Sequence, residues 1–456
     1  MSRPRVALVT ERLLLGGTEK GMVNHALAFD RSRVDVHVVT LLGDGPRLEQ
    51  LQSAGIPSAC AHSDPERLAQ LLQGSDVVHV FRIGLADALV PEARRRAGVP
   101  VMVETNIFGQ VDASEDRGQF DAHLFISKMC ALRYRQRLGV DARGFRSRHA
   151  VGYLPVDAEG LRAQAPNRRA AKAALGLDPD RPVVGRTGRD DDRKWRNLLV
   201  DMVEPLLARV PEAQVLFVGA TPAKVGRLYR AGVLDRCRLM PLVPEASLAL
   251  VYRACDVFVN AAEIGEAQGL VLAEALALEV PVVTCSTPWV DNAQIEVVDE
   301  GSDGHVADHP VAFAEAVAHL LHPEVNRRYG AAGAAKARRL FDPGALSAQL
   351  EGLYRSLLAG DGIPAQWSPS AEEVLEFESE YARRLESRFR PLTAAERREV
   401  ELERLRERAG WALRAAAHLD RRKASFLYWM LRAKLAELTP GSASPPGPTA
   451  GPAAPA

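Results

Sequence analysis

Short apolar runs alternate with helical patterns along the first part of the chain. Five runs are rich in β-branched residues: 6–10, 34–41, 76–81, 100–105 and 122–127. Helical patterns, such as the one at 18–29, separate these runs. Apolar strands joined by helices are typical of a parallel sheet that is covered on both faces. Residues 1–157 are therefore predicted to form a doubly wound, Rossmann-like α/β domain.

The same alternation resumes after a charged connecting segment at 158–181. Four further strands are predicted: 182–185, 213–219, 256–260 and 281–284. Helical patterns follow them, so residues 182–360 are predicted to form a second Rossmann-like domain. Two such domains in tandem place a ligand-binding crevice between the carboxyl ends of their sheets.

The pattern changes again at 361–438, where a helical extension is predicted. Ser370 and Glu373 form a capping box that opens a helix. One stripe of that helix is apolar: Val374, Phe377, Tyr381 and Leu385. A longer helix from about Leu392 carries a heptad seam: Leu402, Leu405, Ala409, Ala412, Ala416 and Leu419. These helices either pack on the preceding domains or mediate self-association, and the Pro- and Ala-rich segment 439–456 is predicted to be a disordered tail.

Composition narrows the class of protein. The 456 residues include 58 Lys and Arg against 58 Asp and Glu, so the zero formal charge gives no electrostatic case for nucleic-acid binding. The five cysteines show no CxxC pair and no zinc-ligand spacing, which favours buried free thiols. The N-terminus lacks the apolar region of a signal peptide, and no apolar stretch is long enough to span a bilayer. We therefore expect a cytoplasmic protein that is at most peripheral at the membrane.

The strongest chemical signal is a pair of carboxylates eight positions apart, Glu266 and Glu274. The first lies in a loop after a predicted strand, and the second lies inside a helix whose N-terminal end falls at Gly269 and Leu270. Free backbone N–H groups and the helix dipole suit a phosphate at that end. Glu274 is then placed to bind ribose hydroxyls, and Glu266 to bind hydroxyls of a sugar. The alternative, two solvated charges on a helix, does not explain why Glu266 follows a buried strand.

A basic pair, Arg189 and Lys194, follows the first strand of the second domain. A leaving diphosphate gains negative charge as a glycosidic bond breaks, and fixed cations beside it stabilise that charge. Arg189 suits bidentate contact with phosphate oxygens, and Lys194 adds a point charge. The alternative is a basic surface loop beside the acidic run Asp190–Asp192.

Two glycines, Gly16 and Gly17, separate the first predicted strand from the first helix. They permit close approach of the backbone to a ligand, although the GxGxxG dinucleotide pattern is missing. A plain tight turn is the alternative.

Together these motifs resemble a known family. The run from Glu266 to Val283 is similar to the Glu-x7-Glu signature of the retaining glycosyltransferases of family 4 (glycosyl transferases group 1), which have the GT-B fold. Gly188–Lys194 resembles the family's Gly-Arg-x4-Lys, and further matches occur at Gly16–Glu19 and Pro155–Asp157. The matches follow the family's order from about Arg5 to Leu358.

The resemblance implies a fold and a reaction. Two Rossmann-like domains would face a cleft, with the acceptor on the first domain and a nucleotide-sugar donor on the second. Transfer would be retaining, of the hexosyl type, without a cofactor or metal, and Arg189, Lys194 and helix N-termini would take the place of a metal. Because no protein nucleophile is evident, we expect same-face attack in which the departing phosphate accepts the proton of the acceptor. The acceptor stays open among a glycan, a lipid-linked molecule and a small molecule.

The sequence departs from the family pattern at several positions. Asn106 stands where the family has a histidine, and it can hydrogen-bond a sugar hydroxyl but cannot act as an acid or base. Glu104 and His79, in two predicted strands, are the remaining candidates for proton transfer, although a structural histidine is the more common case. Gln268 replaces an aromatic residue, and Leu154 replaces an asparagine.

Two other functions stay open from the sequence. A nucleotide-sugar epimerase of the same fold would convert the donor without an acceptor. A non-catalytic binding subunit would use the C-terminal helices as its working surface, and would tolerate loss of the phosphate-binding cations. Both Arg189 and Lys194 are nevertheless present.

Overall fold

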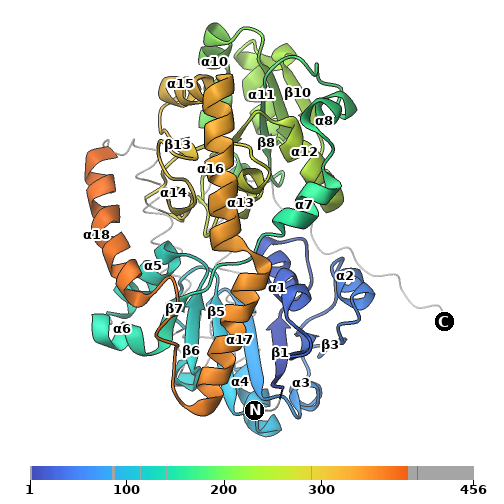
Figure 1. Cartoon of the computed structure of the whole chain (residues 1–456), viewed down its shortest axis with the longest axis vertical. Coiled ribbons are helices and arrows are strands. Elements are labelled where there is room, and N and C mark those ends of the chain that lie inside the picture. Colours follow the sequence, from blue (N-terminus) through green and yellow to red (C-terminus); the bar gives the residue numbers. More distant parts are fainter. Residues whose placement is uncertain are drawn as a thin grey trace, which may run out of the picture. The chain divides into compact units, whose positions relative to one another are not determined.

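A seven-stranded parallel sheet forms the first domain (Figure 1). In the order β3-β2-β1-β4-β5-β6-β7, it consists of β1 (Arg5–Thr10), β2 (Asp35–Thr40), β3 (Ser58–Cys60), β4 (Val77–Arg82), β5 (Val101–Asn106), β6 (Ala122–Phe125) and β7 (His149–Val151). This computed structural model describes residues 3–84, 88–112, 115–139, 141–288 and 290–388, together with Arg398. All five predicted strands are confirmed, whereas β3 and β7 are too short to show a pattern of their own.

Both faces of this sheet are buried, as its apolar strands predict. On β1, Val6 and Leu8 belong to one buried cluster, whereas Ala7 and Val9 belong to another. Successive side chains of a strand point to opposite faces, so two separate cores flank the sheet. The helices of this domain are α1 (Gly17–Ala28), α2 (Leu48–Ser53), α3 (Pro65–Leu72), α4 (Leu89–Ala97), α5 (Lys128–Leu138) and α6 (Ala142–Arg148).

A six-stranded parallel sheet forms the second domain (Figure 1). In the order β10-β9-β8-β11-β12-β13, it consists of β8 (Val183–Thr187), β9 (Gln214–Val218), β10 (Cys237–Met240), β11 (Val257–Asn260), β12 (Val282–Thr284) and β13 (Gly304–Val306). Its helices are α9 (Leu198–Asp201), α10 (Val203–Arg209), α11 (Pro222–Arg230), α12 (Leu248–Ala254), α13 (Leu270–Ala277), α14 (Gln294–Val297) and α15 (Pro310–Leu321). The connecting segment forms α7 (Ala158–Gln164) and α8 (Arg168–Ala174), and both helices contact α12.

The C-terminal helices return to the first domain. α16 (Pro323–Phe341) packs on α13, whereas α17 (Pro343–Ala359) packs against α1 and β5 (Figure 1). Between them Asp342 is extended, and its carboxylate accepts a hydrogen bond from a backbone N–H of α17 at 2.7 Å. Pro343 has no N–H to continue α16, so one helix ends and another begins here. The prediction placed 343–360 in the second domain, but the contacts of α17 lie with the first.

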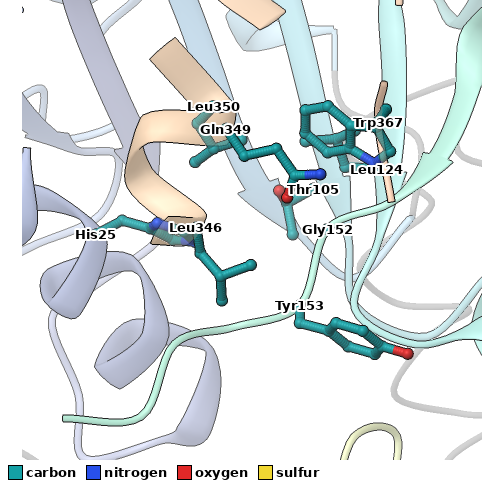
Figure 2. A pocket seen from close by; sticks show the side chains of 9 residues that line it. All are labelled: His25, Thr105, Leu124, Gly152, Tyr153, Leu346, Gln349, Leu350 and Trp367. Atoms are coloured by element: carbon teal, nitrogen blue, oxygen red, sulfur yellow. The ribbon is translucent and has the colours of Figure 1, made fainter. Parts of the chain in front are cut away.

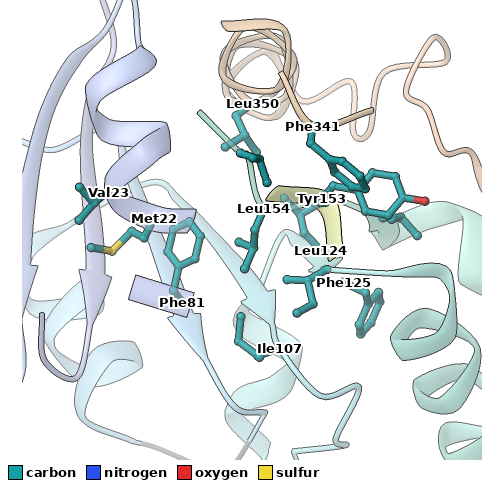
Figure 3. Close-up of a cluster of buried hydrophobic side chains, with 14 of the residues drawn as sticks. Met22, Val23, Phe81, Ile107, Leu124, Phe125, Tyr153, Leu154, Phe341 and Leu350 are labelled. Atoms are coloured by element: carbon teal, nitrogen blue, oxygen red, sulfur yellow. The ribbon is translucent and has the colours of Figure 1, made fainter. Parts of the chain in front are cut away.

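The core of the first domain consequently contains residues from this crossing. Phe341 and Leu350 lie beside Tyr153 in one buried cluster (Figure 3), and the Phe341 and Tyr153 rings meet edge to face with their centroids 5.4 Å apart. A cavity of about 10 Å³ remains near α1, α17 and β5, with His25 and Thr105 in its lining (Figure 2). That is room for about one water molecule.

The predicted capping box opens α18 (Ala371–Arg388). The Ser370 N–H donates to the Glu373 carboxylate at 2.6 Å, and the Glu373 N–H donates to the Ser370 hydroxyl at 3.2 Å. Three members of the predicted stripe are buried: Val374, Phe377 and Tyr381. The helix contacts α5 and α6, so the start of the extension packs on the first domain.

Other predictions for the extension lie outside the described residues. They concern the side chain of Leu385, the heptad seam of the helix from Leu392 and the tail 439–456. Within the described part, every helix is too short or too polar to cross a membrane. The cysteines are free thiols as predicted, and four of the five are buried: Cys60, Cys130, Cys255 and Cys285, with Cys237 partly exposed.

Candidate functional site

The loops that follow β1, β8 and β11 carry the predicted motifs. Gly16 and Gly17 follow β1 and begin α1, while Gly269 and Leu270 follow β11 and begin α13. A Cβ atom added at Gly17 would lie 3.1 Å from Leu270 Cδ1, so the first turns of two helices from different domains lie close together. A Cβ atom at Gly16 would collide with the carboxylate of Glu19. Glycine at position 17 therefore allows α1 and α13 to approach closely, and glycine at position 16 leaves room for the Glu19 carboxylate.

Lys194 and Glu266 form an ion pair after the ends of β8 and β11. Lys194 Nζ lies 2.9 Å from Glu266 Oε2, and Asn260 Nδ2 donates to Glu266 Oε1 at 3.3 Å. The Glu266 N–H donates to Gln294 Oε1 at 3.0 Å, which holds the backbone as well. Burial opposes ionisation of Glu266, but Lys194, Arg186 and the hydrogen bond from Asn260 together outweigh it, so the pKa lies below its ordinary value. At neutral pH Glu266 is therefore a carboxylate that accepts hydrogen bonds.

A buried arginine supports this pair. Arg186, in β8, is 1% exposed, donates to the Lys194 carbonyl at 3.0 Å and lies 5.2 Å from the Trp195 ring centroid. Burial lowers the pKa of Arg186 to about 10, so the side chain stays cationic and adds positive potential at Glu266. The sequence pattern did not single out Arg186, although a charged residue within an apolar strand is a signal that could have found it.

The N-terminus of α13 begins beside Glu266. Gly269 precedes the helix with φ 87°, in the left-handed region that favours glycine, and a Cβ atom there would lie 3.7 Å from Glu266 Cβ. Among the described residues no side chain caps the helix, so its first N–H groups are left for another acceptor. A phosphate suits that position.

Glu274 is buried, and protein groups engage both of its carboxylate oxygens. Lys20 Nζ, from α1, lies 2.6 Å from Oε1. The Tyr252 hydroxyl donates to Oε2 at 2.7 Å. The residue predicted to bind a ribose is thus paired with a cation from the other domain.

Lys20 belongs to a chain of alternating charges that links the two domains. Its Nζ also lies 3.1 Å from Glu245 Oε1, and Glu245 Oε2 lies 2.7 Å from Arg47 Nη2. Burial opposes the charged form of Lys20, but Glu274 and Glu245 outweigh it and raise the pKa of Lys20. The sequence pattern did not predict this chain, because its members come from distant segments that carry no shared motif.

Arg189 is exposed on the loop after β8. Its carbonyl accepts a hydrogen bond from Trp195 Nε1 at 2.9 Å, which fixes the backbone while the guanidinium stays accessible. The charge of Arg189 affects Glu19, in the first turn of α1. Burial raises the pKa of Glu19, and the positive charges of Arg47 and Arg189 partly offset that rise. Arg189 therefore lies at the same junction as the Gly16–Gly17 loop.

Asn106 and Glu104 are committed to contacts within the first domain. Asn106 is fully buried and donates to the Gln110 carbonyl at 2.8 Å. Glu104 accepts hydrogen bonds from Arg82 and His123, and although burial opposes its ionisation, these partners lower its pKa. Within the part of the chain that the structure describes, the hydrogen bonds of both side chains lie in the first domain, and neither bonds to the Lys194–Glu266 pair.

His79 is held as a structural histidine. Its Nδ1 lies 2.6 Å from the Tyr354 hydroxyl of α17, and its Nε2 lies 2.7 Å from Thr105 Oγ1. Burial lowers the pKa of His79 well below its ordinary value, so the ring is neutral. In the part of the chain that the structure covers, no three His, Cys, Asp or Glu side chains are arranged to hold a metal ion.

Gln268 and Leu154, the two residues that replace an aromatic residue and an asparagine, contact each other. The Gln268 side chain accepts a hydrogen bond from Leu154 N at 2.8 Å and donates one to Leu154 O at 2.8 Å. This pair of hydrogen bonds joins the end of the first domain to the loop that carries Glu266. An amide side chain satisfies both backbone groups, which an aromatic side chain does not.

The fold and the site define a class of protein. Two parallel-sheet α/β domains whose motif loops meet at the carboxyl ends of the strands constitute the GT-B fold. Residues 181–323 match the family model of glycosyl transferases group 1. The glycosyltransferase of Rickettsia africae shares the fold, with a TM-score of 0.66 at 14% identity over 78% of this chain and 99% of that chain. HepE of Anabaena, solved in complex with UDP and glucose, has a TM-score of 0.62 at 16% identity over 77% of this chain and 100% of that one.

Curated relatives share parts of the sequence. The D-inositol 3-phosphate glycosyltransferase of Segniliparus rotundus is 33% identical over 207 residues, which are 43% of this chain and 45% of that protein. The phosphatidyl-myo-inositol mannosyltransferase of Mycobacterium leprae is 32% identical over 184 residues, which are 39% and 48% of the two chains. The chain thus spans about half the length of these relatives.

Proposed function

We propose that the protein is a retaining glycosyltransferase of family 4, which moves a sugar from a nucleotide-diphosphate sugar to an acceptor hydroxyl. The carrying observation is that Lys194, Glu266 and the uncapped N-terminus of α13 lie together. A cation, a carboxylate that accepts hydrogen bonds and a phosphate-binding helix end are the groups that a sugar diphosphate requires. The glycosyltransferase names of the relatives support the same class.

Each residue then has a role in the proposed reaction. The first N–H groups of α13, with Lys194 and Arg189, bind the diphosphate and stabilise its growing charge. Glu266 accepts hydrogen bonds from hydroxyls of the transferred sugar, and Glu274 accepts them from the ribose. The acceptor oxygen bonds to C1 on the face from which the phosphate leaves, the bond between C1 and the phosphate oxygen breaks, and the acceptor proton passes to that oxygen.

The names of the relatives suggest the first substrates to test. HepE was solved with UDP and glucose, so UDP-glucose is a sensible first donor. Two relatives are named for inositol-containing acceptors, so inositol phosphate and phosphatidylinositol are sensible first acceptors. With any productive pair, NMR of the product should show that the anomeric configuration of the donor is kept. An inverted product would contradict the retaining mechanism.

Nucleotide binding is the first test of the proposal. Wild type and Glu274→Gln are titrated by calorimetry and thermal shift against UDP, GDP, ADP and dTDP, with exposed Glu324→Gln as a matched control. We expect one nucleotide to bind wild type and the control, and to bind Glu274→Gln at least about tenfold more weakly, because hydrogen bonds to a charged group are lost. Absence of binding by all four nucleotides would overturn the donor site and favour another function.

A further inference from the structure

We propose that Lys20 occupies the place at Glu274 that the ribose of the donor takes, so that nucleotide binding requires Glu274 to exchange partners. This inference rests on the function proposed above. It assigns Lys20 and Glu245 as residues that set nucleotide affinity and selectivity for ribose, although neither lies among the motifs of the second domain.

Protein donors occupy both carboxylate oxygens of Glu274, and burial restricts access to the lone pairs that remain. Lys20 Nζ lies 2.6 Å from one oxygen, and the Tyr252 hydroxyl donates to the other at 2.7 Å. The Glu274 side chain is 4% exposed and that of Lys20 is 17% exposed. Because so little of the Glu274 side chain is exposed, a ribose hydroxyl reaches it only where one of these two donors moves aside.

Lys20 is the donor that can move away from Glu274, because a second carboxylate, Glu245, also pairs with it. Glu245 Oε1 lies 3.1 Å from Lys20 Nζ, and Glu245 in turn is paired with Arg47 at 2.7 Å. A lysine that leaves Glu274 keeps Glu245 as its partner, so its charge is not left unpaired in a poorly hydrated place. Tyr252 is wholly buried in the hydrophobic core, and among the described residues its hydroxyl has no second acceptor.

The exchange has an energetic consequence. Wild type must break a buried ion pair before the ribose binds, and neutral hydroxyls replace the ammonium on a carboxylate. Removing the ammonium leaves Glu274 with an unsatisfied oxygen, which the ribose then satisfies. A ligand without ribose hydroxyls gains nothing from this change, because it never competes with Lys20.

The test compares ribose-bearing and ribose-modified ligands of the base identified above. Wild type, Lys20→Met and the conservative Lys20→Arg are titrated with the nucleoside diphosphate, the uncharged nucleoside and the 2′,3′-dideoxynucleoside. Lys336→Met is the matched control, since Lys336 is also buried and paired with two carboxylates, Asp299 and Asp303. We expect Lys20→Met to bind the nucleoside about tenfold more tightly than wild type, with no change for the dideoxynucleoside. Lys20→Arg should restore wild-type affinity.

Other outcomes overturn the inference. Unchanged or weaker nucleoside binding by folded Lys20→Met contradicts it, and weaker binding confined to the diphosphate identifies Lys20 as a phosphate ligand instead. If Lys20→Met does not fold, a crystal structure of the wild-type nucleotide complex decides: Lys20 still paired with Glu274 overturns the exchange. A nucleotide that binds wild type but not Glu274→Gln leaves the proposed function standing even where the Lys20 inference fails.

Discussion

At the scale of single residues, the site contains a largely buried carboxylate, Glu266, that stays ionised because cations lie beside it. Burial alone would raise the pKa of Glu266, yet Lys194 at 2.9 Å, with Arg186 and Asn260, holds it low. Removing one partner of a buried ion pair is destabilising, because the remaining charge is left unpaired and poorly hydrated. In the proposed function Lys194 thus has two roles, as a cation for the diphosphate and as a partner that helps to keep Glu266 negative.

Replacing Lys194 should test both roles, and replacing a nearby exposed arginine controls for the loss of a positive charge at the surface. We expect Lys194→Met to lower kcat by about a hundredfold, because a fixed cation beside the leaving group is lost. The pKa of Glu266 should rise in the same variant, so activity should fall off at a higher pH on the acid side. Arg193→Met is the control, because Arg193 is exposed and pairs with Asp191. Equal kcat values for the two variants in a steady-state assay would contradict this role.

At the scale of elements, helix N-termini differ in whether side chains of the protein cap them. Among the described residues no side chain caps the start of α13. The start of α5, in contrast, is capped across the domains by Glu296, which accepts hydrogen bonds from Lys128 N at 3.0 Å and Met129 N at 3.3 Å. α18 is capped by its own residues, Ser370 and Glu373. A helix end that the protein satisfies is structural, and one that it leaves open is a candidate binding position.

The cap of α18 can be tested on its own. We expect Ser370→Ala to destabilise the start of α18 by about 1 kcal/mol, because the Glu373 N–H loses its acceptor. Hydrogen exchange at Glu373 and Val374 should then be about fivefold faster. Ser53→Ala, at an exposed serine that ends α2, should leave these amides unchanged. Unaltered exchange in Ser370→Ala would show that packing on the first domain, not the cap, holds this end.

At the scale of the whole molecule, the crossing of α17 places buried neutral histidines between the first domain and the C-terminal helices. His25 Nδ1 lies 3.1 Å from Ser347 Oγ of α17, and His79 Nδ1 lies 2.6 Å from the Tyr354 hydroxyl. Burial lowers the pKa of His25 from 6.5 to about 3. Protonation of either ring therefore opposes the packing of α17 on the first domain.

Stability should consequently depend on pH through these rings. Because the folded-state pKa of His25 is depressed, its contribution is complete above pH 6.5 and is lost as the pH falls from 6.5 towards about 3. Within that window one histidine changes the free energy of unfolding by about 1.4 kcal/mol per pH unit. Urea unfolding at pH 7.5, 6.0 and 5.0 should show a shallower pH dependence in His25→Gln than in wild type. The control His322→Gln, at an exposed histidine, should match wild type.

Local pattern alone determined much of this protein. Apolar strands separated by helices predicted both sheets, because burial on both faces leaves a continuous apolar run in the sequence. The same pattern placed Glu266 and Lys194 in loops after buried strands, and the Ser370–Glu373 spacing predicted a helix start that the structure confirms. These features are readable because the interactions that produce them span only a few residues.

Only the tertiary structure decided which of these groups meet. Lys194 and Glu266 are 72 positions apart, and Lys20 and Glu274 are 254 positions apart, so no periodicity or spacing records either contact. The return of α17 to the first domain likewise brings Tyr354, 275 positions away, into contact with His79. This contact gives His79 a structural role. Long-range contacts depend on how domains pack, and a buried charge or ring acquires its role from the partner that this packing supplies.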